Sequence, residues 1–174
     1  SGFSPNYYGA FGRHHLDFSL RSSVEITRRD FIKQTSIILA GGFTMATDHF
    51  TDQELMCHCG CLDCYMQAQF MESLEKIRVE MNRPLKLSSA KRCSKHNQEV
   101  SSTGPNGPHT DHGDGGQAVD ILISGSDALR LMEVARKYGM SGIGVKQSGK
   151  NRFIHLDNLG NATGQPRPWV WSYS

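Results

Sequence analysis

The sequence predicts an α+β domain in which helices pack on a small antiparallel sheet. Two long segments repeat apolar residues at helical spacing, and several short segments alternate like strands. Two of the short segments are joined by Ser148-Gly149-Lys150, which predicts an antiparallel hairpin. With 174 residues, 37% of them hydrophobic, the chain can build one ordinary core. We expect this domain over residues 47–174, after an N-terminal extension of residues 1–46.

The N-terminal extension carries the segment "RRDFIK", which begins at Arg28 and is followed by a short apolar patch from Ile37 to Ala40. This order resembles a twin-arginine export signal, and the alternative is an amphipathic helix with two solvated arginines. The patch is too short to span a bilayer. Met45 is a second candidate for the start of the natural protein, which would make the preceding residues an upstream segment.

Four helices are expected along the domain. Thr51 and Glu54 match a capping box that begins a short helix. Residues 66–81 place apolar side chains on one face and charges on the other, so we expect a core-packing helix there. Residues 93–100 predict another short helix, and the last one is expected to begin at a Ser126 cap and end at Gly139.

The expected strands are short. Residues 85–89 alternate in polarity, and residues 117–123 form a mainly apolar run. The hairpin is expected to pair residues 142–147 with residues 152–158. Because its strands pair with near neighbours and its helices lie apart from them, the domain is predicted to be α+β.

Five cysteines leave two structural alternatives open. Four lie in "CHCGCLDC" and the fifth lies further along the chain: Cys57, Cys59, Cys61, Cys64 and Cys93. They could form one or two disulfides or a second, closed zinc site, although a bridge between residues as close as Cys57 and Cys59 is awkward. A nucleic-acid-binding zinc module is disfavoured, because the spacing is not that of a zinc finger and the net charge is only +2.

A candidate zinc site combines a loop histidine with two strand residues. Asp120 lies in an apolar strand, where an ionised carboxylate needs a partner or a metal. His155 lies in the hairpin, and the period of two places Asp157 on the same face. With His109 or His112 from the glycine-rich loop of residues 107–116, the set suits zinc-assisted hydrolysis. Alternatively, each residue could be an ordinary paired or hydrogen-bonded side chain.

Several motifs together resemble a known family. They are "GPHT" with "GGQAVDI", then "RFIHLD", "PLKLSSAKRCSKHN" and the closing "RPWVWSY". They resemble zinc D-alanyl-D-alanine carboxypeptidases, vancomycin-resistance dipeptidases and phage endolysin peptidases, which are related in fold to lysostaphin and hedgehog. The resemblance implies that Asp120 and His155 bind zinc with one loop histidine. The flanking residues favour His109 and the spacing to Asp120 favours His112, and we take His109.

The same resemblance implies roles for two further residues. Arg92 matches the arginine that binds the substrate carboxylate or carbonyl oxygen, where positive charge stabilises an oxyanion. Many members carry an acidic general base three residues before the last histidine, but Arg152 stands there, and arginine cannot accept a proton. We therefore expect Asp157 to be the general base, with orientation of a histidine as its alternative role.

The expected activity is that of a zinc peptidase on peptidoglycan stem peptides or cross-links, either an endopeptidase or a D,D-carboxypeptidase. The alternative is a non-catalytic, zinc-containing module of the same fold that binds cell wall or protein. We expect a Zn²⁺ cofactor, a peptidoglycan partner, no nucleic acid, no stable membrane insertion and a monomer. The expected location is periplasmic or extracellular, at the cell wall, and a phage lysis enzyme would fit.

Overall fold

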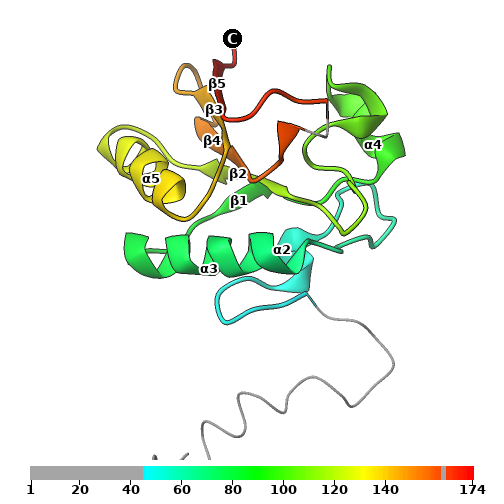
Figure 1. Cartoon of the computed structure of the whole chain (residues 1–174), viewed down its shortest axis with the longest axis horizontal. Helices are drawn as coiled ribbons and strands as arrows, with labels where there is room; N and C mark the ends of the chain where they lie inside the picture. Colours follow the sequence, from blue (N-terminus) through cyan, green and yellow to red (C-terminus); the bar gives the residue numbers. More distant parts are fainter. Residues whose placement is uncertain (1–44, 162–163) are drawn as a thin grey trace, which may run out of the picture. The chain divides into compact units, whose positions relative to one another are not determined.

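The computed structural model of the chain describes residues 45–161 and 164–174, so the twin-arginine-like segment lies outside it. Helices and strands follow one another in this order (Figure 1): α2 (Asp52–Leu55), α3 (Ala68–Met81), β1 (Leu87–Ser89), α4 (Ser94–Val100), the 3-10 helix η1 (Gly104–Asn106), β2 (Ala118–Leu122), α5 (Ser126–Lys137), β3 (Gly142–Lys146), β4 (Phe153–Asp157) and β5 (Trp169–Ser172). None of the helices in this part of the chain has the length and apolarity that a membrane span requires.

One five-stranded sheet organises the domain, with the strand order β1-β2-β4-β3-β5. The pairs β1–β2, β2–β4 and β3–β4 are antiparallel, which includes the expected hairpin. The last strand, β5, was not expected as a strand, and it pairs parallel with β3. The predicted α+β class is confirmed, and the sheet is mixed because the C-terminal strand joins its edge.

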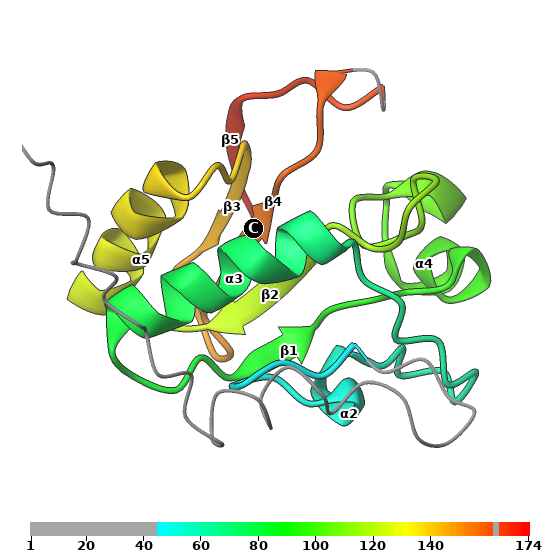
Figure 2. The ribbon, with the colours of Figure 1, turned by 60° about the horizontal axis from the view of Figure 1, so that its bottom comes forward.

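The two faces of the sheet have different surroundings. Figure 2 shows α3 and α5 together on one face, and the hydrophobic core lies there. Val119 and Ile121 from β2 join that core, as do Ile154 and Leu156 from β4. Because side chains alternate along a strand, the residues between them project from the opposite face. The functional side chains of β2 and β4 therefore lie away from the helices.

The helix termini agree with most expectations. The capping box between Thr51 and Glu54 is present, with the Glu54 N–H donating to Thr51 Oγ1. The expected cap at Ser126 is wrong, since Gly125 precedes α5 and Ser126 is already its first residue. Gly125 has a φ of 65°, a conformation that favours glycine, and it makes no side-chain cap. The chain therefore passes from β2 to α5 through the backbone conformation of Gly125, without a side-chain cap.

The glycine-rich loop before β2 is held by its own hydrogen bonds. Asp111 Oδ1 accepts from the N–H groups of Gly113 at 2.7 Å and Gly115 at 3.0 Å. Gly116 forms a bridge with Met66, just before α3. A Cβ on Gly115 would come within 2.7 Å of the backbone of Met66, so a side chain there would push the loop away. The loop is thereby fixed just before β2, the interior strand that carries Asp120.

Candidate metal centre

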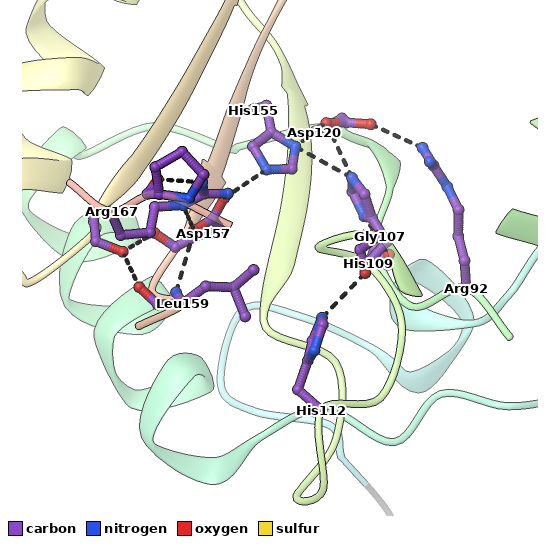
Figure 3. Close-up of polar contacts among 12 residues, drawn as sticks. Arg92, Gly107, His109, His112, Asp120, His155, Asp157, Leu159 and Arg167 are labelled. Atoms are coloured by element: carbon purple, nitrogen blue, oxygen red, sulfur yellow. Dashed lines mark hydrogen bonds and ion pairs between the residues drawn. The ribbon is translucent and has the colours of Figure 1, made fainter. Parts of the chain in front are cut away.

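Three side chains from separate segments converge on the open face of the sheet (Figure 3). Asp120 and His155 are direct partners in the β2–β4 pairing, so their side chains lie side by side. Asp120 Oδ1 lies 2.8 Å from His155 Nδ1. His109 comes from the glycine-rich loop, and its Nε2 lies 3.2 Å from His155 Nδ1 and 3.3 Å from Asp120 Oδ1. All three residues are buried.

The spacing of these atoms suits a zinc ion. Nitrogen and oxygen ligands lie about 2.0–2.1 Å from zinc, so two tetrahedral ligands are about 3.3 Å apart. The separations of 2.8, 3.2 and 3.3 Å are close to that value. Two histidines and one carboxylate leave a fourth position free, as in catalytic zinc sites. The three residues therefore form a fitting donor set for a metal.

Each histidine has a partner that fixes its orientation. His109 Nδ1 lies 2.6 Å from the carbonyl oxygen of Ala90, so Nδ1 carries the proton and donates it there. His155 Nε2 lies 3.1 Å from Asp157 Oδ2, where it donates to the carboxylate. Such outer partners set the tautomer of metal-binding histidines. In the neutral imidazoles they leave His109 Nε2 and His155 Nδ1 as acceptors, and these are the two nitrogens that converge.

Asp157 is fully buried and surrounded by donors. Arg167 donates Nε to Asp157 Oδ1 at 2.7 Å and Nη2 to Oδ2 at 2.6 Å, a bidentate ion pair. The backbone N–H of Leu159 donates to Oδ1 at 3.2 Å. A Cβ on Gly142 would collide with both the Asp157 carboxylate and the Arg167 guanidinium. The Asp157–Arg167 ion pair therefore fills the space beside β3 that is open because residue 142 is glycine.

Arg92 reaches the same centre from the other side (Figure 3). Its Nη2 donates to Asp120 Oδ2 at 3.0 Å, while Nε donates to Ser89 Oγ at 2.8 Å. Nη1 donates to Asn97 Oδ1 at 3.2 Å, and Asn97 is itself buried. Asp120 thus directs one oxygen to the histidines and the other to the arginine. Arg92 orients the carboxylate and lies beside the convergence point.

Burial and charge set the protonation of the cluster. Burial lowers the pKa of His109, which keeps its imidazole neutral. Burial raises the pKa of Asp120, but the two histidines outweigh it and hold that pKa well below its ordinary value. Burial lowers the pKa of His155, yet hydrogen bonds to Asp120 and Asp157 outweigh this and raise it. The pKa of Asp157 is lowered because His155 and Arg167 outweigh its burial.

His112 does not join the three converging residues. Its Nε2 lies 3.1 Å from the carbonyl oxygen of Gly107 and thus ties the glycine-rich loop to itself (Figure 3). Arg152, at the position of the usual acidic base, is exposed just before β4. Of the two loop histidines, the structure therefore brings His109 to Asp120 and His155.

A cavity of about 740 Å³ opens onto the cluster. Arg92, His109, Asp120 and His155 line it on one side. Aromatic residues of β4 and the C-terminal segment form another wall: Phe153, Trp169, Trp171 and Tyr173. Burial raises the pKa of the Tyr173 hydroxyl to about 12, so it stays protonated at neutral pH. The cavity therefore combines a polar centre with an apolar wall, as ligand sites commonly do.

The aromatic wall is the part of the site that sequence reasoning missed. The ring of Trp171 lies 5.1 Å from that of His155, between centroids. A Cβ on Gly144 would come within 2.7 Å of the side chains of Trp171 and Tyr173. The alternation of aromatic residues in "WVWSY" was a signal for a strand that directs its rings to one face.

One of three comparisons with known proteins identifies the family of this chain. Comparisons with curated proteins and with solved structures return no match. The model of the family described as peptidase M15 matches residues 48–157, more than half of the chain. The match ends at Asp157 and spans the three converging residues, Asp157 itself and Arg92. The chain belongs to the peptidase M15 family, a family of zinc-dependent peptidases.

Proposed function

We propose that this protein is a zinc-dependent peptidase that hydrolyses amide bonds in peptidoglycan stem peptides or cross-links. The observation that carries the proposal is the convergence of His109, Asp120 and His155, each with a separate partner that fixes its direction. A merely structural polar cluster does not require that the free nitrogens of both histidines face one carboxylate oxygen. Membership of a metallopeptidase family supports the same chemistry.

In this proposal, His109 Nε2, Asp120 Oδ1 and His155 Nδ1 hold the zinc ion. A bound zinc ion would polarise the scissile carbonyl and lower the pKa of a water molecule. Arg92 lines the cavity beside the ligands, where its guanidinium can bind a substrate carboxylate or a developing oxyanion. Its hydrogen bonds to Ser89 and Asn97 hold the guanidinium in place before substrate arrives.

For Asp157, we propose orientation of His155, the second of its two expected roles. Four donors already occupy its two oxygens: two from Arg167 and one each from Leu159 and His155. It is fully buried and does not line the cavity. The bidentate pair with Arg167 also keeps it a weak base, because a nearby cation lowers a carboxyl pKa.

The cavity supports a peptide substrate with a carboxylate. Its aromatic wall offers apolar contact, while Ser88, Ser101 and Thr103 offer hydroxyl groups to amide groups. Arg92 adds one positive charge beside the metal ligands. Peptidoglycan stem peptides combine small side chains, amides and carboxylates, so we propose them as the substrate class. This substrate would place the protein in the periplasm or outside the cell, at the cell wall.

One observation favours a second candidate function, a zinc-containing module that binds wall peptides without cutting them. Among the described residues that line the cavity, Asp120 is the only carboxylate, and it already faces the histidines and Arg92. A general base must lie within hydrogen-bonding reach of the water that it deprotonates, directly or through one further water. The binding module would need no such group.

Digestion of purified peptidoglycan by the zinc-loaded full chain separates the two functions. Released fragments are identified by mass and new amino groups are quantified, beside the His155→Ala variant and an Asp48→Asn control. Asp48 is an exposed carboxylate outside the cavity. The peptidase predicts fragments of defined mass with wild type and Asp48→Asn, and none with His155→Ala. Intact peptidoglycan that still retains the zinc-loaded protein would establish the binding module instead.

A further inference from the structure

A second cluster of potential metal ligands lies outside the cavity. The sulfur atoms of Cys57, Cys59, Cys61 and Cys93 all lie within 4.8 Å of one another. Cys59 Sγ is 3.4 Å from Cys57 Sγ and 3.6 Å from Cys93 Sγ. Neither the cavity nor the proposed hydrolysis uses these residues. Their convergence therefore needs its own explanation.

The chain folds specifically to bring these sulfurs together. Residues 58–61 form a tight turn, in which Gly60 has a φ of 83° that favours glycine. The turn is closed by a hydrogen bond of 2.8 Å from the Cys57 N–H to the Asp63 carbonyl oxygen. Cys57, just before the turn, and Cys59 and Cys61 within it thus present three sulfurs to one point. The fourth comes from Cys93, which precedes α4 in a distant part of the sequence.

The sulfur spacing matches a tetrahedral thiolate site. With zinc–sulfur bonds of about 2.3 Å, tetrahedral sulfur ligands are about 3.8 Å apart. The observed sulfur–sulfur distances of 3.4 and 3.6 Å are close to that separation. A disulfide would instead bring two sulfurs to about 2.05 Å and use them as a pair. It would give no reason for four sulfurs to share one centre.

Nitrogen donors surround the cluster as they would surround bound thiolates. The backbone N–H of Cys93 donates to Cys57 Sγ at 3.4 Å. The N–H of His96 donates to Cys93 Sγ, also at 3.4 Å. His96 Nδ1 lies 3.2 Å from Cys57 Sγ, where its N–H would donate to a thiolate. Four thiolates around a divalent ion leave excess negative charge, and such donors offset it.

We propose that Cys57, Cys59, Cys61 and Cys93 form a closed structural zinc site, separate from the cluster in the cavity. All four coordination positions would be filled by protein sulfur, so the ion would have no catalytic position. It would join the turn before α3 to the start of α4. The proposal depends only on the sulfur cluster, so it stands or falls independently of peptidase activity.

The location of this site gives it a structural consequence for the cavity. Cys93 directly follows Arg92, whose N–H donates to the His109 carbonyl oxygen at 2.9 Å and whose side chain holds Asp120. The buried Lys91 lies 3.5 Å from Asp63 in the cysteine-containing loop. A zinc ion on the four sulfurs would therefore anchor the segment that positions Arg92 against the zinc ligand Asp120.

The fifth cysteine provides a matched control. Cys64 lies in the same loop but is not one of the four converging residues, and it packs against the hydrophobic core. Removal of its sulfur should leave the site intact. By contrast, removal of both Cys59 and Cys61, which are exposed, takes two ligands without opening the core.

Metal content of the full chain tests the proposal, first with wild type. Zinc per chain is measured by mass spectrometry, and apo protein is titrated with Co²⁺ alone to detect sulfur-to-cobalt charge-transfer bands. We expect two zinc ions per chain for wild type and Cys64→Ser. His155→Ala should keep one, with the charge-transfer bands intact. The Cys59→Ser/Cys61→Ser variant should also keep one, with these bands lost.

Alkylation of the wild-type protein tests the same site without a substitution, so its result does not depend on whether a variant folds. With zinc bound, an alkylating reagent should modify Cys64 first and spare the other four cysteines, and chelation should expose all five. The proposal is overturned if wild-type protein binds a single zinc and its Co²⁺ form lacks charge-transfer bands. It is equally overturned if intact-mass and peptide analysis find a disulfide among the four.

Discussion

Substitution of Asp157 by asparagine distinguishes the two roles that this residue could have. Asparagine keeps the shape of the side chain but removes its charge, and one of its two terminal groups becomes a donor. Because Arg167 donates to both oxygens of Asp157, that NH₂ group faces an Arg167 donor in either orientation, and at the Oδ2 position it also faces His155. The variant therefore loses the ion pair and weakens the bond that fixes the His155 tautomer.

The expected effects follow from burial. Arg167 is buried and would lose its carboxylate partner, and the removal of one member of a buried pair costs about 3–5 kcal/mol. Loss of an outer partner of a metal-binding histidine lowers metal affinity by roughly 10–100-fold. This factor corresponds to about 1.4–2.7 kcal/mol of binding free energy. We expect the Asp157→Asn variant to bind zinc that much more weakly and to unfold at lower denaturant concentration.

Zinc affinity is measured by competition with a chromophoric chelator, and hydrolysis is measured at saturating zinc. If Asp157 orients His155, excess zinc should restore most of the turnover. If Asp157 is the general base, zinc affinity should be near that of wild type while the rate falls by roughly 10²–10⁴-fold at any zinc concentration. The second pattern would refute the positioning role. Asp48→Asn is the control for removal of one negative charge.

Three further predictions test other parts of the site. Gly142→Ala should lower the free energy of unfolding by about 1–3 kcal/mol in denaturant titrations, because the new Cβ would collide with the Asp157 carboxylate, and wild-type stability would contradict this. Arg92→Ala should slow hydrolysis by roughly 10²–10³-fold at saturating zinc, and an unchanged rate would exclude an oxyanion-binding role. The pKa of His155 is raised above 6.5, and its protonated form cannot bind metal. As the pH is lowered, zinc affinity should therefore begin to decrease while the pH is still above 6.5, and below the pKa of His155 it should decrease about tenfold per pH unit. A constant affinity from pH 8 to pH 5 would contradict the ligand assignment.

Local pattern was enough to predict most of the fold. The helical repeat of residues 66–81, the capping box at Thr51 and the hairpin each depend on residues close together in the sequence, and the structure has all three. Strand β5 was missed although "WVWSY" alternates like a strand, and its parallel pairing with β3 is a contact that no local pattern specifies. The cap at Ser126 was wrong because the turn at Gly125 is set by backbone conformation.

The candidate site divides in the same way. Period-two alternation along β4 placed His155 and Asp157 on one face, and the structure has them in contact. The bidentate pair of Asp157 with Arg167 could not be expected, because Arg167 lies in the segment that leads to the unpredicted β5. Similarly, the choice between His109 and His112 depends on loop geometry, and only His109 faces Asp120 in the structure.

The most direct test of the zinc centre is anomalous scattering from crystals of the zinc-loaded full chain, measured on both sides of the zinc absorption edge. We predict a peak bounded by His109 Nε2, Asp120 Oδ1 and His155 Nδ1, with His155 Nε2 still bonded to Asp157. A zinc-containing protein without a peak at this position, or with the ion on His155 Nε2, would contradict the account.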